Sequence, residues 1–212
     1  MAYDVRERLD PKSTALIVFE CQEGVIGEKS HLPGLAAAAR DGEMVAHIAT
    51  LLDSARSCGV GVFYCTVNKR PDGIGNPFNT PIEMRLRSQN PDPDAAPDMG
   101  EVVAALAPQE GDVVVSRQHG LTGFYESGLD TFLRNTGVRS VVLTGVSVNI
   151  GILGTAIEAV NRGYTAIVPT DCVAGDPPEY AEQALRYAVR NVALLTGHSE
   201  VAAAWANWAN PK

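Results

Sequence analysis

A strand–turn–helix pattern in residues 141–163 limits the folds that this chain can adopt. The segment reads VVLTGVSVNIGILGTAIEAVNRG and opens with an unbroken run of β-branched and aliphatic residues, as expected for a strand buried on both faces of a parallel sheet. After a turn at residues 145–147, apolar residues recur at helical spacing. A helix that starts just beyond a strand presents free backbone N–H groups, and open α/β sheets bind ligands at such strand ends. The segment therefore predicts a parallel α/β fold and the position of a ligand site.

The rest of the chain alternates between apolar runs and helical patterns. The predicted strands are residues 14–19, 60–67, 112–117, the run that opens at residue 141 and ends at the turn of residues 145–147, 164–174 and 191–197. Besides the helix after that turn, the predicted helices are residues 42–57, 128–135, 179–190 and a last one capped by Ser199. Strands that alternate with helices are typical of parallel sheets with right-handed crossovers. The pattern predicts a three-layer α/β/α sandwich with a mostly parallel sheet of about six strands, similar to the Rossmann fold.

Composition restricts the class of protein further. The 212 residues are 45% hydrophobic, which suits one domain over residues 1–212 with a single sizeable core. A net charge of -8 argues against nucleic acid or an anionic membrane as the main partner, so we expect a small-molecule ligand. The four cysteines are widely spaced, the first ten residues lack the apolar segment of a signal peptide, and no run reaches the length of a membrane span. We therefore expect a cytoplasmic protein.

Residues 69–99 differ from the rest of the chain. They are rich in Pro, Asp, Asn and Gly, with one short helical pattern at residues 82–87. A loop of this length inside a compact domain is often a lid or a binding loop, and a dispensable insertion is an equally good interpretation. We find no internal repeat and no linker that would divide the chain.

Searches for cofactor and metal motifs fail. No GxGxxG or GxxxxGK[ST] pattern follows a strand, and the histidines show no HExxH spacing. His47 falls in the first predicted helix, where a surface or partly buried residue is a better interpretation than a ligand. We expect neither a cofactor nor a metal ion.

One motif comes close to a nucleophile elbow. GVSVN at residues 145–149 is similar to GxSxG, and Ser147 is followed by Asp171 and His198 in the chain order of an α/β-hydrolase triad. However, Asn149 stands where the final glycine of the motif lets the helix pack close to the strand. The chain is also short for an α/β-hydrolase. A serine hydrolase is therefore a minor alternative.

Three segments together resemble the isochorismatase-like hydrolases, also called the cysteine hydrolase superfamily. They are ALIVFECQEG at residues 15–24, the stretch from VVVSRQHGLTGFYESGLD to AVNRGY at residues 113–164, and TDCVAGDPPEYAEQALRYAV at residues 170–189. The resemblance covers most of the chain except the loop at residues 69–99. It implies the same α/β sandwich and a homo-oligomer, either a dimer or a tetramer.

The resemblance also implies where the catalytic residues should lie, and all three differ from the family pattern. The family's aspartate at the end of the first strand is Glu20 here. The family's lysine precedes the Phe of an SAF-like motif by six residues, and counting back from Phe124 gives Gln118. The family's nucleophilic cysteine corresponds to Gly151. The peptide bond after the GV pair is commonly cis in the family, which implies a cis Val146-Ser147 bond.

These positions define the candidate site. Arg117, next to Gln118, is expected to point to the opposite face of its strand and so away from the site. Cys21 and Cys172 sit at strand ends, where their side chains diverge from the neighbouring carboxylates, so neither replaces the missing nucleophile. The catalytic candidates are Glu20, Gln118 and Gly151, and the substrate-binding candidates are Gln22, His119, Phe124, Val146, Ser147, Asn149 and Ile150.

Chemistry without a cysteine remains open to this chain. True isochorismatases, which cleave a vinyl ether, are similar in having glycine in an IG pair, as at Ile150-Gly151 here. Protonation of an enol ether needs a carboxylic acid and no nucleophile, and Glu20 can supply it if burial raises its pKa. We expect a hydrolase that acts on a small polar metabolite by non-covalent acid–base hydrolysis. The alternative is an inactive homologue that binds a small ligand or serves as an oligomeric scaffold.

Overall fold

The chain forms one seven-stranded sheet in the computed structural model, which describes residues 4–89 and 97–209. The strand order is β3-β2-β1-β4-β5-β7, all neighbouring pairs are parallel, and the short β6 pairs with β4. The strands are β1 (Thr14–Phe19), β2 (Gly61–Val67), β3 (Val113–Arg117), β4 (Ser140–Val146), β5 (Thr165–Pro169), β6 (Val173–Ala174) and β7 (Leu194–Thr196).

Eight α-helices are described around this sheet. They are α1 (Glu23–Ile26), α2 (Pro33–Asp41), α3 (Met44–Cys58), α4 (Pro81–Gln89), α5 (Leu129–Asn135), α6 (Leu153–Asn161), α7 (Pro178–Tyr187) and α8 (His198–Ala209). A π-helical turn, Val148–Ile152, leads from β4 into α6. None of the helices within the described ranges is long and apolar enough to cross a membrane.

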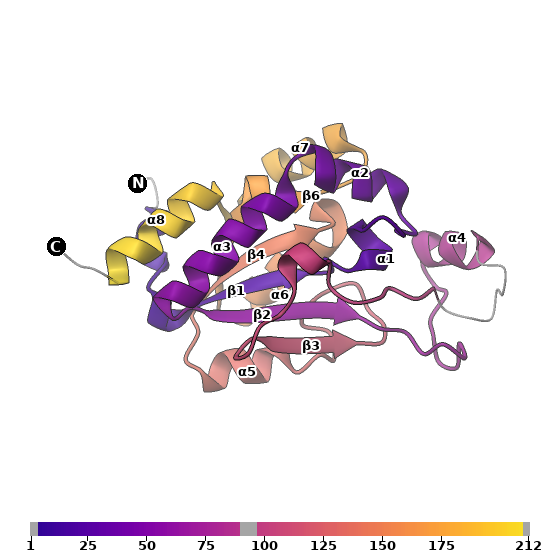
Figure 1. Cartoon of the computed structure of the whole chain (residues 1–212), viewed down its shortest axis with the longest axis horizontal. Coiled ribbons are helices and arrows are strands. Elements are labelled where there is room, and N and C mark those ends of the chain that lie inside the picture. The colour runs from indigo at the N-terminus through magenta and orange to yellow at the C-terminus, as the bar shows by residue number, and fades with distance from the viewer. Residues whose placement is uncertain (1–3, 90–96, 210–212) are drawn as a thin grey trace.

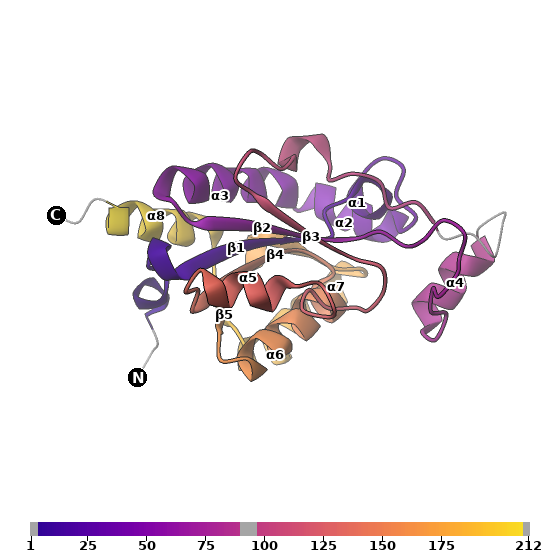
Figure 2. The same cartoon turned by 90° about the horizontal axis from the view of Figure 1, so that it is seen from below.

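The helices cover both faces of the sheet. Figure 2 shows α1, α2, α3 and α8 on one face and α5, α6 and α7 on the other. Each face has its own buried cluster: Leu51 of α3 and Trp205 of α8 belong to one, and Leu133 of α5 and Ala156 of α6 belong to the other. The strands between them are apolar on both faces; β1 and β4 are buried along their whole length. The predicted three-layer α/β/α sandwich is confirmed.

The direction in which the chain adds strands reverses beside β1. From β1 the chain builds β2 and β3 on one side and then returns to place β4 on the other. Phe19, the last residue of β1, is in register with Gly145 of β4, so the two strands end together. A side chain at Gly145 would place its Cβ 2.1 Å from the Phe19 carbonyl oxygen, and the residue has φ 105°. Glycine is therefore required where the crevice between the strand ends opens.

The long loop carries one helix of its own. Helix α4 extends the predicted 82–87 segment and stands beyond the carboxyl ends of the strands in both views (Figures 1 and 2). An ion pair of 2.8 Å between Lys69 Nζ and Glu83 Oε1, both nearly buried, holds this helix to the segment that follows β2. Part of the predicted loop, residues 90–96, lies outside the described residues. Helix α2 was not predicted, because its PGLAAAARD sequence lacks a strong apolar period.

Candidate active site

The carboxylate of Glu20 lies at the carboxyl end of β1, on the side of β2 and β3. The residue directly follows β1, and its backbone N–H donates to the Cys65 carbonyl oxygen of β2 at 2.9 Å. Its φ of 51° is in the left-handed region, which turns the side chain out of the regular alternation of the strand. The side chain is 21% exposed, so it is partly accessible to solvent.

Arg117, the last residue of β3, forms an ion pair with Glu20. The guanidinium is almost fully buried: Nε donates to the Gly120 carbonyl oxygen at 3.3 Å, Nη1 to the Thr66 carbonyl oxygen at 3.4 Å, and Cζ lies 4.9 Å from the centroid of the Phe19 ring. The expectation that Arg117 points away from the site was therefore wrong. The side chain of Gln118 is exposed instead, and no hydrogen bond is formed by it among the described residues.

Strand alternation accounts for this difference. In β3, Arg117 is in register with Val67 at the end of β2. Because side chains alternate along a strand, a displacement of one residue reverses the face. The face that contacts Glu20 is that of Arg117 and not that of Gln118.

Charges of alternating sign surround the Glu20 carboxylate. Burial raises the pKa of Glu20, while Arg117 and, at greater distance, Lys69 oppose that shift. Lys69 in turn pairs with Glu83 of α4. These charges alternate in sign from β3 through β1 to the long loop, in the order Arg117, Glu20, Lys69 and Glu83. Helix α4 is therefore connected electrostatically to Glu20.

The position of the family nucleophile has no room for a side chain. Gly151 lies in the π-helical turn, and a Cβ there would be 2.5 Å from Cε1 of Phe19 and 3.2 Å from the Val146 carbonyl oxygen. Non-bonded carbon atoms normally approach to about 3.5–4.0 Å. A cysteine at this position would require the buried Phe19 ring to move.

The cysteines of the chain do not replace that nucleophile. Cys21, Cys65 and Cys172 are buried and Cys58 is half-buried. Burial raises the pKa of Cys65 to about 12, and the pKa values of Cys21 and Cys172 are raised further. A buried thiol with so high a pKa carries almost no thiolate at neutral pH.

A cavity of about 470 Å³ lies between the turn after β4 and helix α4. Ser147, Asn149 and Ile150 line it from the turn, and Arg85 lines it from the helix. The remaining lining residues come mostly from the start of α2 and the segment before α7: His31, Leu32, Pro33, Gly34, Leu35, Ile82, Gln89, Asp176 and Pro177. The turn contains the cis Val146-Ser147 bond that the family resemblance implied. Val146 itself is fully buried in the core and not on the cavity.

Three other predicted binding residues have structural contacts. Gln22 is fully buried: its Nε2 donates to the carbonyl oxygens of Val67 at 3.2 Å and Gly100 at 2.8 Å, and its Oε1 accepts from the Val67 N–H at 2.8 Å. The amide is therefore used in joining β1 to β2 and to the segment after residue 97. These hydrogen bonds account for the buried Gln22 amide without a role in substrate binding.

Phe124 and His119 likewise lie apart from the cavity beside Ser147. Phe124 is buried against Tyr164, with ring centroids 6.0 Å apart, and the guanidinium of Arg162 lies over its ring. The His119 ring stands edge-on to Tyr125 at 5.6 Å, and both line a separate hollow of about 300 Å³ beside Glu83. The described contacts of these side chains do not include Glu20.

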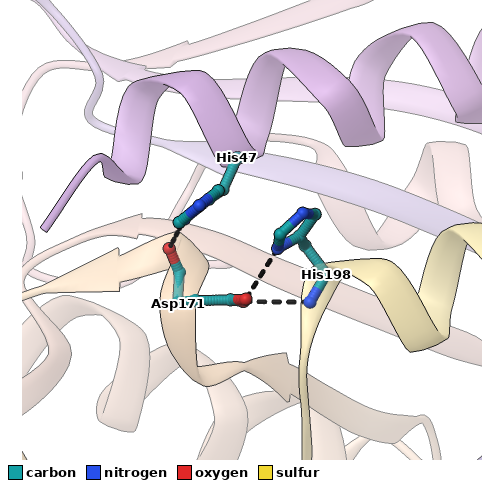
Figure 3. A group of neighbouring side chains, drawn as sticks. All are labelled: His47, Asp171 and His198. Atoms are coloured by element: carbon teal, nitrogen blue, oxygen red, sulfur yellow. Dashed lines mark hydrogen bonds and ion pairs between the residues drawn. The ribbon is translucent and has the colours of Figure 1, made fainter.

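A cluster of His47, Asp171 and His198 was not predicted (Figure 3). His198 Nδ1 lies 2.6 Å from Asp171 Oδ2, which is the pairing expected for a serine triad. However, the ring of His198 stacks on His47 at 4.3 Å, and within the described residues Ser147 forms no hydrogen bond with either triad partner. The structure does not assemble the serine triad.

Comparison with known proteins identifies the family. The isochorismatase domain model matches residues 14–200. The chain belongs to the isochorismatase family of hydrolases. It is 31% identical over 191 residues to a ureidoacrylate amidohydrolase of Methylorubrum extorquens, a match that covers 84% of this chain and 76% of that protein. It is 30% identical over 177 residues to a maleamate amidohydrolase of Pseudomonas putida, covering 79% and 76%.

Solved structures of isochorismatase-like proteins have the same architecture. A cysteine hydrolase from Pseudomonas syringae pv. phaseolicola superposes with a TM-score of 0.75 at 26% identity, covering 95% of this chain and 96% of that one. The family resemblance inferred from sequence motifs is confirmed. The motifs imply that Glu20 and Gly151 stand where the family has Asp and Cys, and in this structure Arg117 is the cation that contacts Glu20.

Proposed function

We propose that this isochorismatase-family protein is a hydrolase that works without a covalent intermediate and uses Glu20 as its acid. The observation that carries the proposal is the contrast between two positions. Gly151 has no space for a nucleophile, whereas the Glu20 side chain is partly exposed and burial raises the pKa of its carboxyl group. A carboxyl group with a raised pKa retains its proton closer to neutrality, as an acid catalyst must.

The reaction that fits these groups is the hydrolysis of a vinyl ether in a small polar metabolite. Glu20 transfers its proton to the terminal carbon of the enol ether, whose π electrons form the new C–H bond and leave an oxocarbenium ion. Water adds to the cationic carbon and returns a proton to the Glu20 carboxylate. The resulting hemiketal breaks its C–O bond to give a ketone and an alcohol, with the hydroxyl proton passing to the leaving oxygen. The acid is restored and one water is consumed.

Arg117 has a defined part in this cycle. Its guanidinium contacts the Glu20 carboxyl group, which must carry a full negative charge once its proton has moved to the substrate. The cation stabilises the deprotonated acid and so assists proton transfer, while burial prevents the acid from being ionised permanently. Arg117 is thus a positioning residue that adjusts the acidity of Glu20.

The cavity beside Ser147 suggests which substrates bind. Relatives of this chain are named for ureidoacrylate and maleamate, which are carboxylates. Arg85 of α4 lines the cavity opposite Ser147 and Asn149, and it forms no ion pair within the described residues. A guanidinium in this place suits a substrate carboxylate. We therefore assign the site to a small carboxylate that is bound beneath α4.

The alternative is a homologue that binds such a carboxylate and does not convert it. The ion pair between Glu20 and Arg117 favours this interpretation, because a carboxylate held by a guanidinium is a weaker acid catalyst than a free carboxyl group. The two functions differ in turnover and agree in ligand class.

Turnover of two substrate classes distinguishes the hydrolase from the binding protein. Purified protein is incubated with isochorismate-like enol ethers and with maleamate-like amides, and the products are quantified by mass spectrometry. We expect enol ether turnover, no amide turnover, and a rate that declines as pH rises through the pKa of Glu20. Glu20→Gln keeps the shape and the contact with Arg117 but has no transferable acid proton, so kcat should fall about 100-fold or more.

The control is a variant of Gln118, the exposed residue next to Arg117. Gln118→Ala should retain wild-type kcat. Thermal stabilisation by an enol ether carboxylate without product would establish the binding protein, and equal turnover by wild type and Glu20→Gln would refute the acid role.

A further inference from the structure

The cluster of His47, Asp171 and His198 brings three metal-ligating side chains together from distant parts of the chain (Figure 3). His47 comes from the first turn of α3, Asp171 follows β5, and His198 begins α8. One ligand atom from each lies within 4.8 Å of the other two. We propose that these residues bind one divalent transition-metal ion of the zinc class, at a site separate from the Glu20 chemistry.

Contacts with Asp171 position both imidazoles. His47 Nδ1 lies 2.9 Å from the Asp171 carbonyl oxygen, which can only accept, so Nδ1 carries the proton and the lone pair lies on Nε2. His198 Nδ1 lies 2.6 Å from Asp171 Oδ2, so an ion that replaces the shared proton can be bound by both atoms. A backbone carbonyl at the other nitrogen holds a histidine ligand in place, as at His47.

The carboxylate is held in place and accessible. The His198 backbone N–H donates to Asp171 Oδ1 at 2.9 Å, and the His198 ring lies at Oδ2. The side chains of Asp171 and His198 are 34% and 21% exposed, so an ion can enter from solvent. The neighbouring Cys172 thiol is fully buried and does not belong to the cluster.

The donor set indicates the kind of metal. Two imidazole nitrogens and one carboxylate oxygen suit Zn²⁺ and related ions, with water as a further ligand, and they suit Ca²⁺ or Mg²⁺ poorly. Ligand bonds of about 2.0–2.2 Å require donor atoms roughly 3.3 Å apart, so the 2.6 Å pair of His198 and Asp171 must open and His47 must move closer on binding. The two rings now stack 4.3 Å apart at 17°, and rotation about their side-chain torsions supplies that movement.

The location gives the ion a structural role. It would join α3 and α8 to the segment between β5 and β6. Two residues after Asp171, Val173 pairs with Gly145 of β4, and Ala174 pairs with Val146. The same segment continues to Asp176, which lines the cavity beside Ser147. Metal binding would thus fix the strand that supports the cis turn of the candidate active site without contributing a group to the reaction.

Metal titration of untagged, chelator-treated protein tests the site. Zn²⁺ binding is followed by calorimetry, and Co²⁺ binding by its visible absorption, whose intensity depends on coordination number. We expect one equivalent of Zn²⁺ and an increase in Tm on saturation. His47→Gln and His198→Gln should each weaken binding about 100-fold or more, since a variant in the outer shell alone typically costs 10–100-fold.

His31→Gln is the matched control, because His31 is also held by a backbone carbonyl, that of Asp98 at 3.0 Å, but lies outside the cluster. It should bind Zn²⁺ like the wild type. Should the cluster variants fail to fold, modification of the wild type by diethyl pyrocarbonate gives the answer, because Zn²⁺ should protect His47 and His198 and not His119. Absence of saturable Zn²⁺ binding, or equal binding by wild type and the cluster variants, would overturn the proposal.

Discussion

Substitution of Gly151 by alanine should destabilise the protein although alanine is the smallest side chain that can be added. The new Cβ would lie 2.5 Å from Cε1 of Phe19, about 1 Å closer than a normal carbon contact. The ring cannot retreat easily, because its Cε2 edge already faces Gly123 and the Arg117 guanidinium lies over its face. Overpacking of this kind costs about 1–3 kcal/mol, which in a chain of this size lowers Tm by roughly 2–4 °C per kcal/mol.

Thermal denaturation measures this effect, and Gly123→Ala is the control. A Cβ at Gly123 would meet its nearest neighbours, Cys65, Thr155 and Phe19, at 3.3–3.4 Å, so a shift of a few tenths of an ångström accommodates it. We expect a Tm within about 1–2 °C of wild type for this variant. In a Phe19→Leu background, the cost of Gly151→Ala should shrink by at least about 0.5 kcal/mol. An unchanged Tm for Gly151→Ala, or strict additivity with Phe19→Leu, would refute the steric argument.

Three further predictions concern stability. Arg117→Met should lower the free energy of urea unfolding at pH 7 by about 1–3 kcal/mol, because the Glu20 carboxyl group loses its partner. Gln118→Ala should lower it by less than about 0.5 kcal/mol, and equal effects of the two variants would contradict the observed pairing. Tyr64→Phe should cost about 1–2 kcal/mol in thermal unfolding, because the Leu106 carbonyl loses its buried donor at 2.8 Å; a neutral result would show that water replaces it. Asp171→Asn, measured in chelator at pH 6–7, should lower the free energy of unfolding by at most about 1 kcal/mol and should lower Tm accordingly. The pKa of Asp171 is lowered in the folded state, so its ionised form stabilises the protein above pH 3.8, and this stabilisation disappears as pH falls through the folded-state pKa. A Tm difference that does not change with pH would contradict this prediction.

The sheet could be predicted from the sequence because its signal is local. The apolar run that forms β1 is buried on both faces, so no other element fits it, and its predicted and observed bounds agree. The run that forms β4 is buried likewise, but the strand extends two residues into the turn predicted at residues 145–147. Helix α3 was predicted within two residues at each end, since its apolar stripe packs on that sheet. Helix α2 was missed because its buried face consists mostly of alanines, Leu35 being the exception, and gives a weak apolar pattern.

The roles of the candidate site residues stay predictions. Glu20 and Gly151 follow strands that the apolar runs fix, so counting residues placed both beyond the carboxyl ends of those strands. Arg117 was missed because the sequence does not show which of two neighbouring strand residues faces Glu20. The cluster of His47, Asp171 and His198 was missed because 124 residues separate the first two in the chain, and tertiary structure alone brings them together. The signal that existed, Asp171 before His198, was assigned to a different partner.

The left-handed backbone of Glu20 has an evolutionary consequence. A residue with a side chain and φ of 51° carries a backbone cost of about 1 kcal/mol or more, and glycine at this position would remove it. Selection for stability alone therefore favours loss of this side chain. We expect proteins that retain a carboxylate at this position to be those in which it is still needed for function. In proteins that no longer need it, the residue should change to glycine or asparagine. The identity of residue 20 across close relatives would then distinguish working sites from relics.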